Sequence, residues 1–155
     1  IDNLLLSFNH TKGENIYNIL FNKKSWNIVE KQDTLKALEL LEHAGIKEKA
    51  YELANDLSYG QQKLLSLICC LAADAKLLLL DEPIAGLNPE MRENILNIIS
   101  DLPNKGKSVI IIEHDMDFIE RICGRVIFMD MGEKISEGTP NEVRNDPKVI
   151  EAYLD

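Results

Sequence analysis

Two short apolar runs, each ending in acidic residues, constrain the fold of this chain more than any other feature of its sequence. Residues 77–83 read LLLLDEP, and residues 109–115 read VIIIEHD. Each run has the length of a strand, and an amphipathic segment long enough for one helix lies between them. Apolar strands that alternate with helices predict a largely parallel sheet covered by helices. We therefore expect strands at 77–81 and 108–113 that are buried on both faces.

Start signals predict helices and a strand pair after the first of these strands. Asn88 followed by Pro89 is a favourable helix start, and this helix should run to about residue 102. Asp115 should cap a helix that runs through residue 122. The remaining elements expected are an antiparallel pair at 125–130 and 133–136, a capping box at 139–142, and a last helix after Pro147.

The first 74 residues are predicted to be helical. Asp33 or Thr34 can cap a helix with a leucine face, and Gly45 should end it. We expect a short helix at 47–54 and a further helix from Gly60 with an apolar stripe. Residues 13–27 are polar, and we interpret them as a loop with a short helical piece.

Charge and cysteine content narrow the classes of function. The chain has 155 residues and a formal net charge of −9, which argues against binding nucleic acid through its phosphates. None of the three cysteines forms a CxxC pair, so we interpret them as reduced core thiols rather than metal or redox groups. No stretch is long and apolar enough to span a bilayer, and the N-terminus lacks the pattern of a signal peptide.

The polar residues after the two strands indicate a ligand site. Ligands of parallel sheets bind at the carboxyl ends of the strands, where Asp81 and Glu82 follow one strand and Glu113, His114 and Asp115 follow the other. Carboxylates and an imidazole there suit phosphate transfer, with one acid holding Mg²⁺ and one base positioning water. The alternative is that the acids mark only where each strand reaches the surface.

A small polar turn, LSYGQQ at 57–62, precedes the predicted helix from Gly60. A hydroxyl and backbone N–H groups at a helix N-terminus suit the binding of an anion.

Four motifs occur in this order, namely LSYGQQ at 57–62, LLLLDEP at 77–83, AGLNP at 85–89 and IIEHD at 111–115. Together they resemble the signature, Walker B, D-loop and switch motifs of the ATP-binding subunit of ABC transporters, with Tyr59 in place of the first glycine of LSGGQ. The LEHAGI segment and the GTPNEVRNDPKVIEAYLD end resemble the branched-chain amino-acid importer type.

The resemblance implies a role for each matching residue. Asp81 would hold Mg²⁺, Glu82 would act as general base on water, and His114 would contact the γ-phosphate. The signature residues Ser58, Tyr59, Gly60 and Gln61 would bind the ATP of a second subunit, with Gly60 allowing close backbone approach. The D-loop residues Gly86, Leu87 and Asn88 would pass between the two subunits.

The family's Walker A loop, GxxxxGK[ST], has no match among these 155 residues. Gly106-Lys107-Ser108 is a partial match, but the residue five before Gly106 is Asp101, and a strand rather than a helix is expected to follow. We interpret it as a helix–strand turn. The Q-loop and the adenine-stacking aromatic residue also lack a match, so the chain is expected to be a C-terminal portion that binds and hydrolyses ATP poorly alone.

The resemblance thus implies a P-loop NTPase core of α/β class with a partial parallel sheet. Residues 1–74 would form the helical subdomain, and residues 75–155 would form the C-terminal half of the core. The implied parent is an ATP- and Mg²⁺-dependent ATPase with permease partners at the cytoplasmic face of the membrane. Alternatives are a non-hydrolysing ABC-like interaction module and a lipopolysaccharide-export type ATPase, while a DNA-repair ABC protein is disfavoured because residues 1–56 lack heptads.

Overall fold

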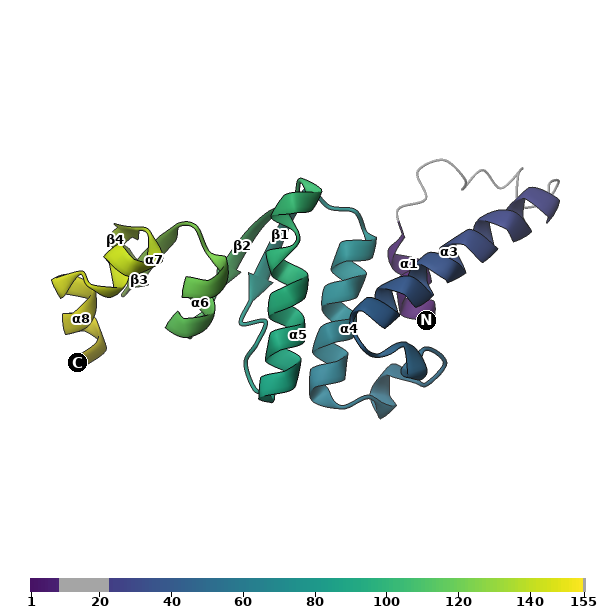
Figure 1. Ribbon diagram of the computed structural model, residues 1–155, viewed down its shortest axis with the longest axis horizontal. Coiled ribbons are helices and arrows are strands. Elements are labelled where there is room, and N and C mark those ends of the chain that lie inside the picture. The colour runs from purple at the N-terminus through teal and green to yellow at the C-terminus, as the bar shows by residue number, and fades with distance from the viewer. Residues whose placement is uncertain (9–22, 155) are drawn as a thin grey trace. The chain divides into compact units, whose positions relative to one another are not determined.

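The computed structural model describes residues 1–8 and 23–154 of the chain (Figure 1). They divide into two compact units, which are described separately. The first unit comprises Ile1–Leu79 and Ile84–Ile110, and the second comprises Leu80–Pro83 and Ile111–Asp155.

Helices make up most of the first unit. Its helices are α1 (Asp2–Ser7), α3 (Lys23–His43), α4 (Tyr59–Ala72) and α5 (Pro89–Ser100), with 3₁₀ turns at Lys47–Lys49, Ala54–Asp56 and Pro103–Lys105. The core is aliphatic, because each helix turns an apolar stripe inward. Leu4 of α1, Leu64 and Ile68 of α4, and Ile95 of α5 are each at most 1% exposed.

Strands β1 (Leu77–Asp81) and β2 (Ser108–Ile112) pair as a two-stranded sheet. The backbone N–H of Ser108 donates to the carbonyl of Lys76 at 2.8 Å, and that of Glu82 donates to the carbonyl of Ile112 at 2.9 Å. Both strands therefore advance in the same direction, and the predicted parallel pair is confirmed.

Burial of these strands on both faces was a wrong prediction. Exposed and less exposed residues alternate along each strand, with Leu79 71% and Ile110 55% exposed. Burial on both faces needs a packing element on each, and the described residues leave more than half of each of these two side chains exposed.

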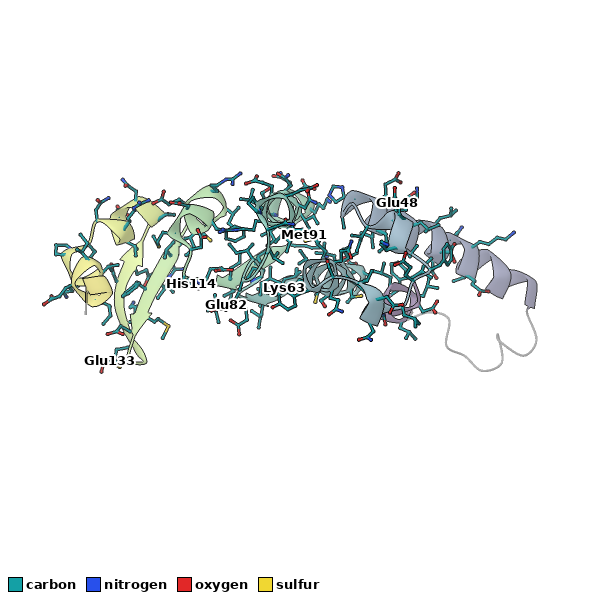
Figure 2. The ribbon with its side chains drawn as sticks, turned by 90° about the horizontal axis from the view of Figure 1, so that it is seen from below. Glu48, Lys63, Glu82, Met91, His114 and Glu133 are labelled. Atoms are coloured by element: carbon teal, nitrogen blue, oxygen red, sulfur yellow. The ribbon has the colours of Figure 1, made fainter. Side chains whose placement is uncertain are left out.

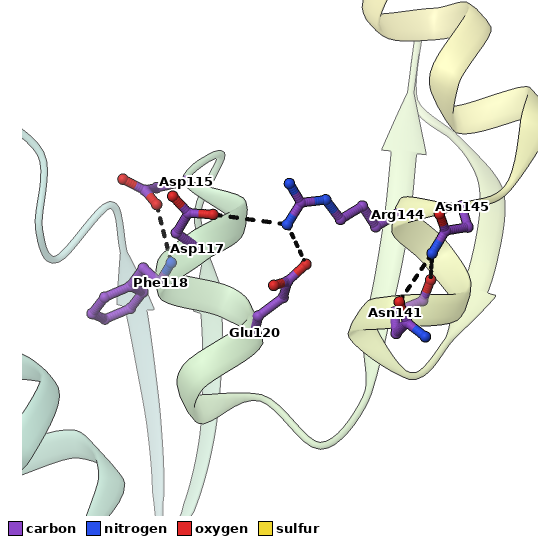
Figure 3. A network of polar contacts seen from close by, with 7 residues as sticks. All are labelled: Asp115, Asp117, Phe118, Glu120, Asn141, Arg144 and Asn145. Carbon is purple, nitrogen blue, oxygen red and sulfur yellow. Dashed lines mark hydrogen bonds and ion pairs between the residues drawn. The ribbon is translucent and has the colours of Figure 1, made fainter.

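The second unit is built on the predicted antiparallel pair, β3 (Val126–Asp130) with β4 (Glu133–Gly138). Helix α6 (Met116–Ile122) precedes the pair, and α7 (Pro140–Arg144) and α8 (Pro147–Leu154) follow it. Helix α7 packs on both strands and α6 packs on α7. The α6–α7 contact includes an ion pair, in which Arg144 donates to Glu120 at 2.7 Å (Figure 3).

Most helix boundaries agree with the sequence patterns, but the first long helix starts earlier than predicted. Helix α3 begins at Lys23, so Asp33 and Thr34 lie in its interior instead of capping it. The hydroxyl of Thr34 donates to the carbonyl of Glu30 at 2.7 Å. No Gly or Pro interrupts residues 23–43, so nothing stops the helix from forming upstream of Asp33. Gly45, at φ +71°, follows the end of the helix as expected.

Two further predictions concern the segments that flank this helix. The helix expected at 47–54 is instead two single 3₁₀ turns, because Leu53 between them is extended and too few residues remain to nucleate an α-helix. Of the loop expected at 13–27, residues 13–22 lie outside the described chain, and the remainder is the start of α3.

Candidate phosphate-binding turn and catalytic strand ends

A reciprocal capping box builds the N-terminus of α4. The Ser58 hydroxyl accepts a hydrogen bond from the Gln61 backbone N–H at 3.3 Å, and the Gln61 side-chain oxygen accepts one from the Ser58 N–H at 3.0 Å. These two bonds satisfy two of the N–H groups that a helix start leaves without an acceptor. The N–H groups of Tyr59 and Gly60 have no acceptor within the helix. With the positive end of the helix dipole, they can serve an anion.

Gly60 is buried against the start of α5. A Cβ at this position would lie 2.1 Å from the Met91 sulfur and 3.2 Å from a methyl carbon of Leu87. A side chain at this position would therefore require the flexible Met91 side chain to shift. The sequence-based reason, close approach of a ligand to the backbone, stays a prediction.

The D-loop residues form the turn that leads into α5. Gly86 has φ +72°, a conformation that glycine adopts without strain. The N–H of Leu87 donates to the carbonyl of Ile84 at 3.3 Å. Asn88 caps α5 as predicted, and its side-chain oxygen accepts from the Met91 N–H at 2.9 Å.

The signature turn and the D-loop meet through two side chains of α4. The Tyr59 ring lies beside Gly86, where an added Cβ would be 3.2 Å from the ring carbon Cε1. Lys63 donates from Nζ to the Ala85 carbonyl at 3.0 Å and lies 5.4 Å from the centre of the Tyr59 ring. Lys63 was not among the predicted site residues, although its i, i+4 spacing from Tyr59 places both residues on one helix face.

A second cluster lies in the second unit, where β1 and β2 end (Figure 2). The Glu82 carboxylate is 3.6 Å from Nδ1 of His114, and both side chains are largely exposed. Glu82 has φ +44°, which is uncommon for a residue with a side chain, and its N–H is tied to the Ile112 carbonyl. Strained backbone of this kind concentrates at functional sites.

The two acidic neighbours of His114 have local structural partners. The Glu113 side chain is 1% exposed, and its oxygen accepts from the His114 backbone N–H at 3.3 Å. Asp115 caps α6 by accepting from the Phe118 N–H at 3.0 Å (Figure 3). Both flanking acids thus orient the turn that carries His114.

A magnesium ion at the end of β1 would need ligands beyond the carboxylate that the described residues offer there. The described residues contain no group of three or more His, Cys, Asp or Glu side chains able to hold a metal. Mg²⁺ usually takes one or two carboxylates and completes its shell with phosphate oxygens and water. Asp81, exposed at the end of β1, can supply one such carboxylate.

The structure therefore forms two groups from the predicted site residues. Ser58–Gln61 and Gly86–Asn88 lie together in the first unit, and Asp81, Glu82 and His114 lie in the second. Gly106 also has the geometry predicted for a turn, with φ +73°, between a 3₁₀ turn and β2.

None of the described helices is both long enough and apolar enough to cross a bilayer.

Two family models match the chain. One, described as "AAA domain, putative AbiEii toxin, Type IV TA system", matches residues 5–120. The other, described as "Branched-chain amino acid ATP-binding cassette transporter", matches residues 133–154.

Relatives and solved structures match almost the whole chain. It is 33% identical over 155 residues to the high-affinity branched-chain amino acid transport ATP-binding protein LivG of Escherichia coli (strain K12), covering 99% of this chain and 61% of LivG. It is 34% identical to the probable LivG of Archaeoglobus fulgidus, covering 99% and 59%. A solved nucleotide-free ATP-binding cassette from an ABC transporter has a TM-score of 0.75 at 33% identity and covers 99% of this chain and 62% of that one.

The fold and these comparisons define a P-loop NTPase fold of the ATP-binding cassette type. The chain belongs to the ATP-binding cassette family, and its relatives there are ATP-binding proteins of branched-chain amino acid transport. It spans about three fifths of the length of these relatives. The family predicted from the four sequence motifs is confirmed.

Proposed function

We propose that this chain is part of an ATP-hydrolysing subunit that drives an amino-acid importer of the branched-chain type. The observation that carries this proposal is the pairing of Glu82, on strained backbone, with His114 at 3.6 Å where two parallel strands end. The transport role is supported by the relatives, which are transport ATP-binding proteins.

In this proposal the second unit carries the reaction. Asp81 would hold Mg²⁺, Glu82 would accept a proton from the attacking water, and His114 would contact the γ-phosphate and stabilise its developing charge. Bound Mg²⁺–ATP supplies the phosphoryl group that is transferred to water. The Glu82 backbone N–H donates to the Ile112 carbonyl, and the His114 backbone N–H donates to the Glu113 carboxylate. These two hydrogen bonds fix the backbone that carries the Glu82 and His114 side chains.

The signature turn acts on the nucleotide of a second ATPase subunit. The Ser58 hydroxyl can still donate, because within the capping box it only accepts. Together with the Tyr59 and Gly60 N–H groups it can bind a γ-phosphate, with Gln61 fixing the turn. Gly86, Leu87 and Asn88 would lie at the subunit boundary.

The remaining assignments follow from this role. Residues 1–74 would be the helical subdomain that faces a membrane permease, and residues 75–155 would be the C-terminal half of the ATPase core. The assembly would work at the cytoplasmic face of the membrane. A net charge of −9 makes nucleic acid an unsuitable partner.

A chimera tests the proposal. Residues 1–155 would replace the aligned region of E. coli LivG, and ATP hydrolysis would be measured for the chimera and its Glu82→Gln and His114→Ala forms. Loss of the general base should lower kcat by about 10²–10⁴-fold, with ATP still bound. Glu151→Gln, which changes an exposed acid on α8 that no predicted role involves, is the matched control. Full activity of the Glu82→Gln chimera would overturn the assignment.

A further inference from the structure

We propose that Lys63 is a positioning residue that clamps the D-loop (residues 86–88) to helix α4, so that the D-loop and the signature turn at the start of α4 move as one body. The proposal concerns residues of the first unit only, and its consequence for catalysis rests on the proposed function. The observation behind it is that one ammonium group joins the side of a helix to the backbone of a loop that is distant in sequence.

The contact made by Lys63 is of a strong kind. Its Nζ donates to the Ala85 carbonyl at 3.0 Å in a partly buried position, 22 residues away along the chain. Hydrogen bonds with an ionised donor are stronger than neutral ones, and partial burial weakens competition from water. The ammonium also lies 5.4 Å from the Tyr59 ring centre, within the range of cation–π attraction.

The turn that Lys63 contacts contains a long backbone hydrogen bond and a glycine. Between Ile84 and Asn88, its backbone hydrogen bond runs from the Leu87 N–H to the Ile84 carbonyl at a long 3.3 Å. Gly86 adopts φ +72° and contributes no side chain to packing. Because glycine has the most backbone freedom to lose on folding, contacts from outside the turn help to hold this conformation.

Contacts from the first turns of α4 provide that selection. The Tyr59 ring packs on Gly86, and Gly60 packs on Leu87 and Met91. These two contacts are van der Waals contacts without direction, whereas the Lys63 bond fixes the orientation of the Ala85 carbonyl. Lys63 thereby fixes the peptide plane that leads into Gly86.

The consequence for function is mechanical coupling. A phosphate that binds the Tyr59 and Gly60 N–H groups contacts the first turn of α4. Lys63 lies one turn further along the same helix. Any shift of this helix start would displace Ala85, and with it the residues proposed to lie at the subunit boundary. Lys63 acts on the D-loop and is not itself a catalytic residue.

Hydrogen exchange of the 155-residue chain, without nucleotide, tests the clamp. Lys63→Met keeps the aliphatic stem and removes the donor, and it should raise the exchange rate of the Leu87 amide at least threefold. Lys63→Arg restores a charged donor and should return this rate toward that of the unmodified chain. The midpoint of urea unfolding reports separately on any general loss of stability.

Lys107→Met is the matched control. Lys107 also donates to a backbone carbonyl of the same unit, that of Ala75 at 2.9 Å, and it pairs with Asp74 at 2.8 Å. Its loss should leave the Leu87 amide unchanged. Unchanged exchange in Lys63→Met, or a rise equal to that in Lys107→Met, would overturn the clamp. Because no nucleotide is used, that result would leave the proposed ATPase function standing, and inactivity of the chimera would leave the clamp standing.

Discussion

Single residues of this chain carry roles that a motif does not reveal. Gly60 matches the signature glycine, for which the motif implies contact with a nucleotide. In the structure its missing side chain makes room for Met91 and Leu87. A glycine can satisfy a ligand and a neighbouring helix at once, so the motif and the packing are separate constraints on the same residue.

The packing constraint predicts coupling between positions 60 and 91. Gly60→Ala gains up to about 1 kcal/mol of helix propensity, and it requires the Met91 side chain to shift away from its contact with position 60. Once shifted, Met91 contributes less packing to the folded chain. Met91→Ala should therefore lower the free energy of unfolding by at least about 0.5 kcal/mol less in the Gly60→Ala background than in the unmodified chain. Urea unfolding of the four proteins of this double-mutant cycle measures the difference. Additive effects would show that the methyl group added by Gly60→Ala does not collide with Met91.

At the scale of elements, capping determines where the helices start. Three caps were predicted from sequence at Asn88, Asp115 and Thr139, and all three are confirmed. Each is a local hydrogen bond between residues three apart, so distant parts of the chain hardly affect it. The signature turn uses the same device, since Ser58 and Gln61 form a capping box.

Ser58→Ala should destabilise the chain by about 1 kcal/mol through loss of this cap. Ser66→Ala on the same helix is the control, because the Ser66 hydroxyl is exposed and bonds back to the Gln62 carbonyl at 2.9 Å. Such a mid-helix bond does not support the helix, so this change should be neutral or slightly stabilising. Urea unfolding compares the two variants, and equal losses would contradict a capping role.

The α7 capping box predicts a pH dependence of stability. Hydrogen bonds from the Thr139 backbone and hydroxyl lower the pKa of Glu142 from its ordinary 4.5. A lowered pKa in the folded state means that the bonds stabilise the chain above pH 4.5, and that this contribution is lost as the pH falls through the folded-state pKa.

Glu142→Gln should accordingly reduce the loss of stability on acidification. The variant keeps a side-chain oxygen that can accept the same bonds but removes the titration. Thermal unfolding between about pH 7 and pH 3 compares the melting temperatures of the unmodified chain and Glu142→Gln. The difference between the two melting temperatures should be largest at neutral pH and should shrink below the ordinary pKa of 4.5. A constant difference would argue against the linkage.

At the scale of the whole molecule, the uncovered side of the β1–β2 sheet is the main departure from an ordinary domain. Exposed residues alternate with less exposed ones along both strands. The apolar side chains of Leu79 and Ile110 are among those that point outward. Apolar side chains and sheet edges left uncovered favour association.

We therefore expect the 155-residue chain to self-associate as its concentration rises. Leu79→Lys with Ile110→Lys should shift it toward the monomer in light scattering. Leu35→Lys, on an exposed leucine of α3, should not change the distribution. A compact monomer at high concentration would contradict the expectation.

The sequence alone determined the elements whose signals are local, and it determined the family. The caps, the two strands, the hairpin and each of the four motifs depend on residues a few positions apart, which is why local patterns predicted them. The start of α3 was misplaced because several residues there can cap a helix and no local signal excludes an earlier start.

Only the tertiary structure decided which side chains meet across long separations. It brought Glu82 to His114, Lys63 to Ala85 and Gly60 to Met91, and it left one face of β1 and β2 exposed. These contacts join residues between 22 and 32 positions apart. The folded backbone creates such proximity, and no periodicity in the sequence encodes it.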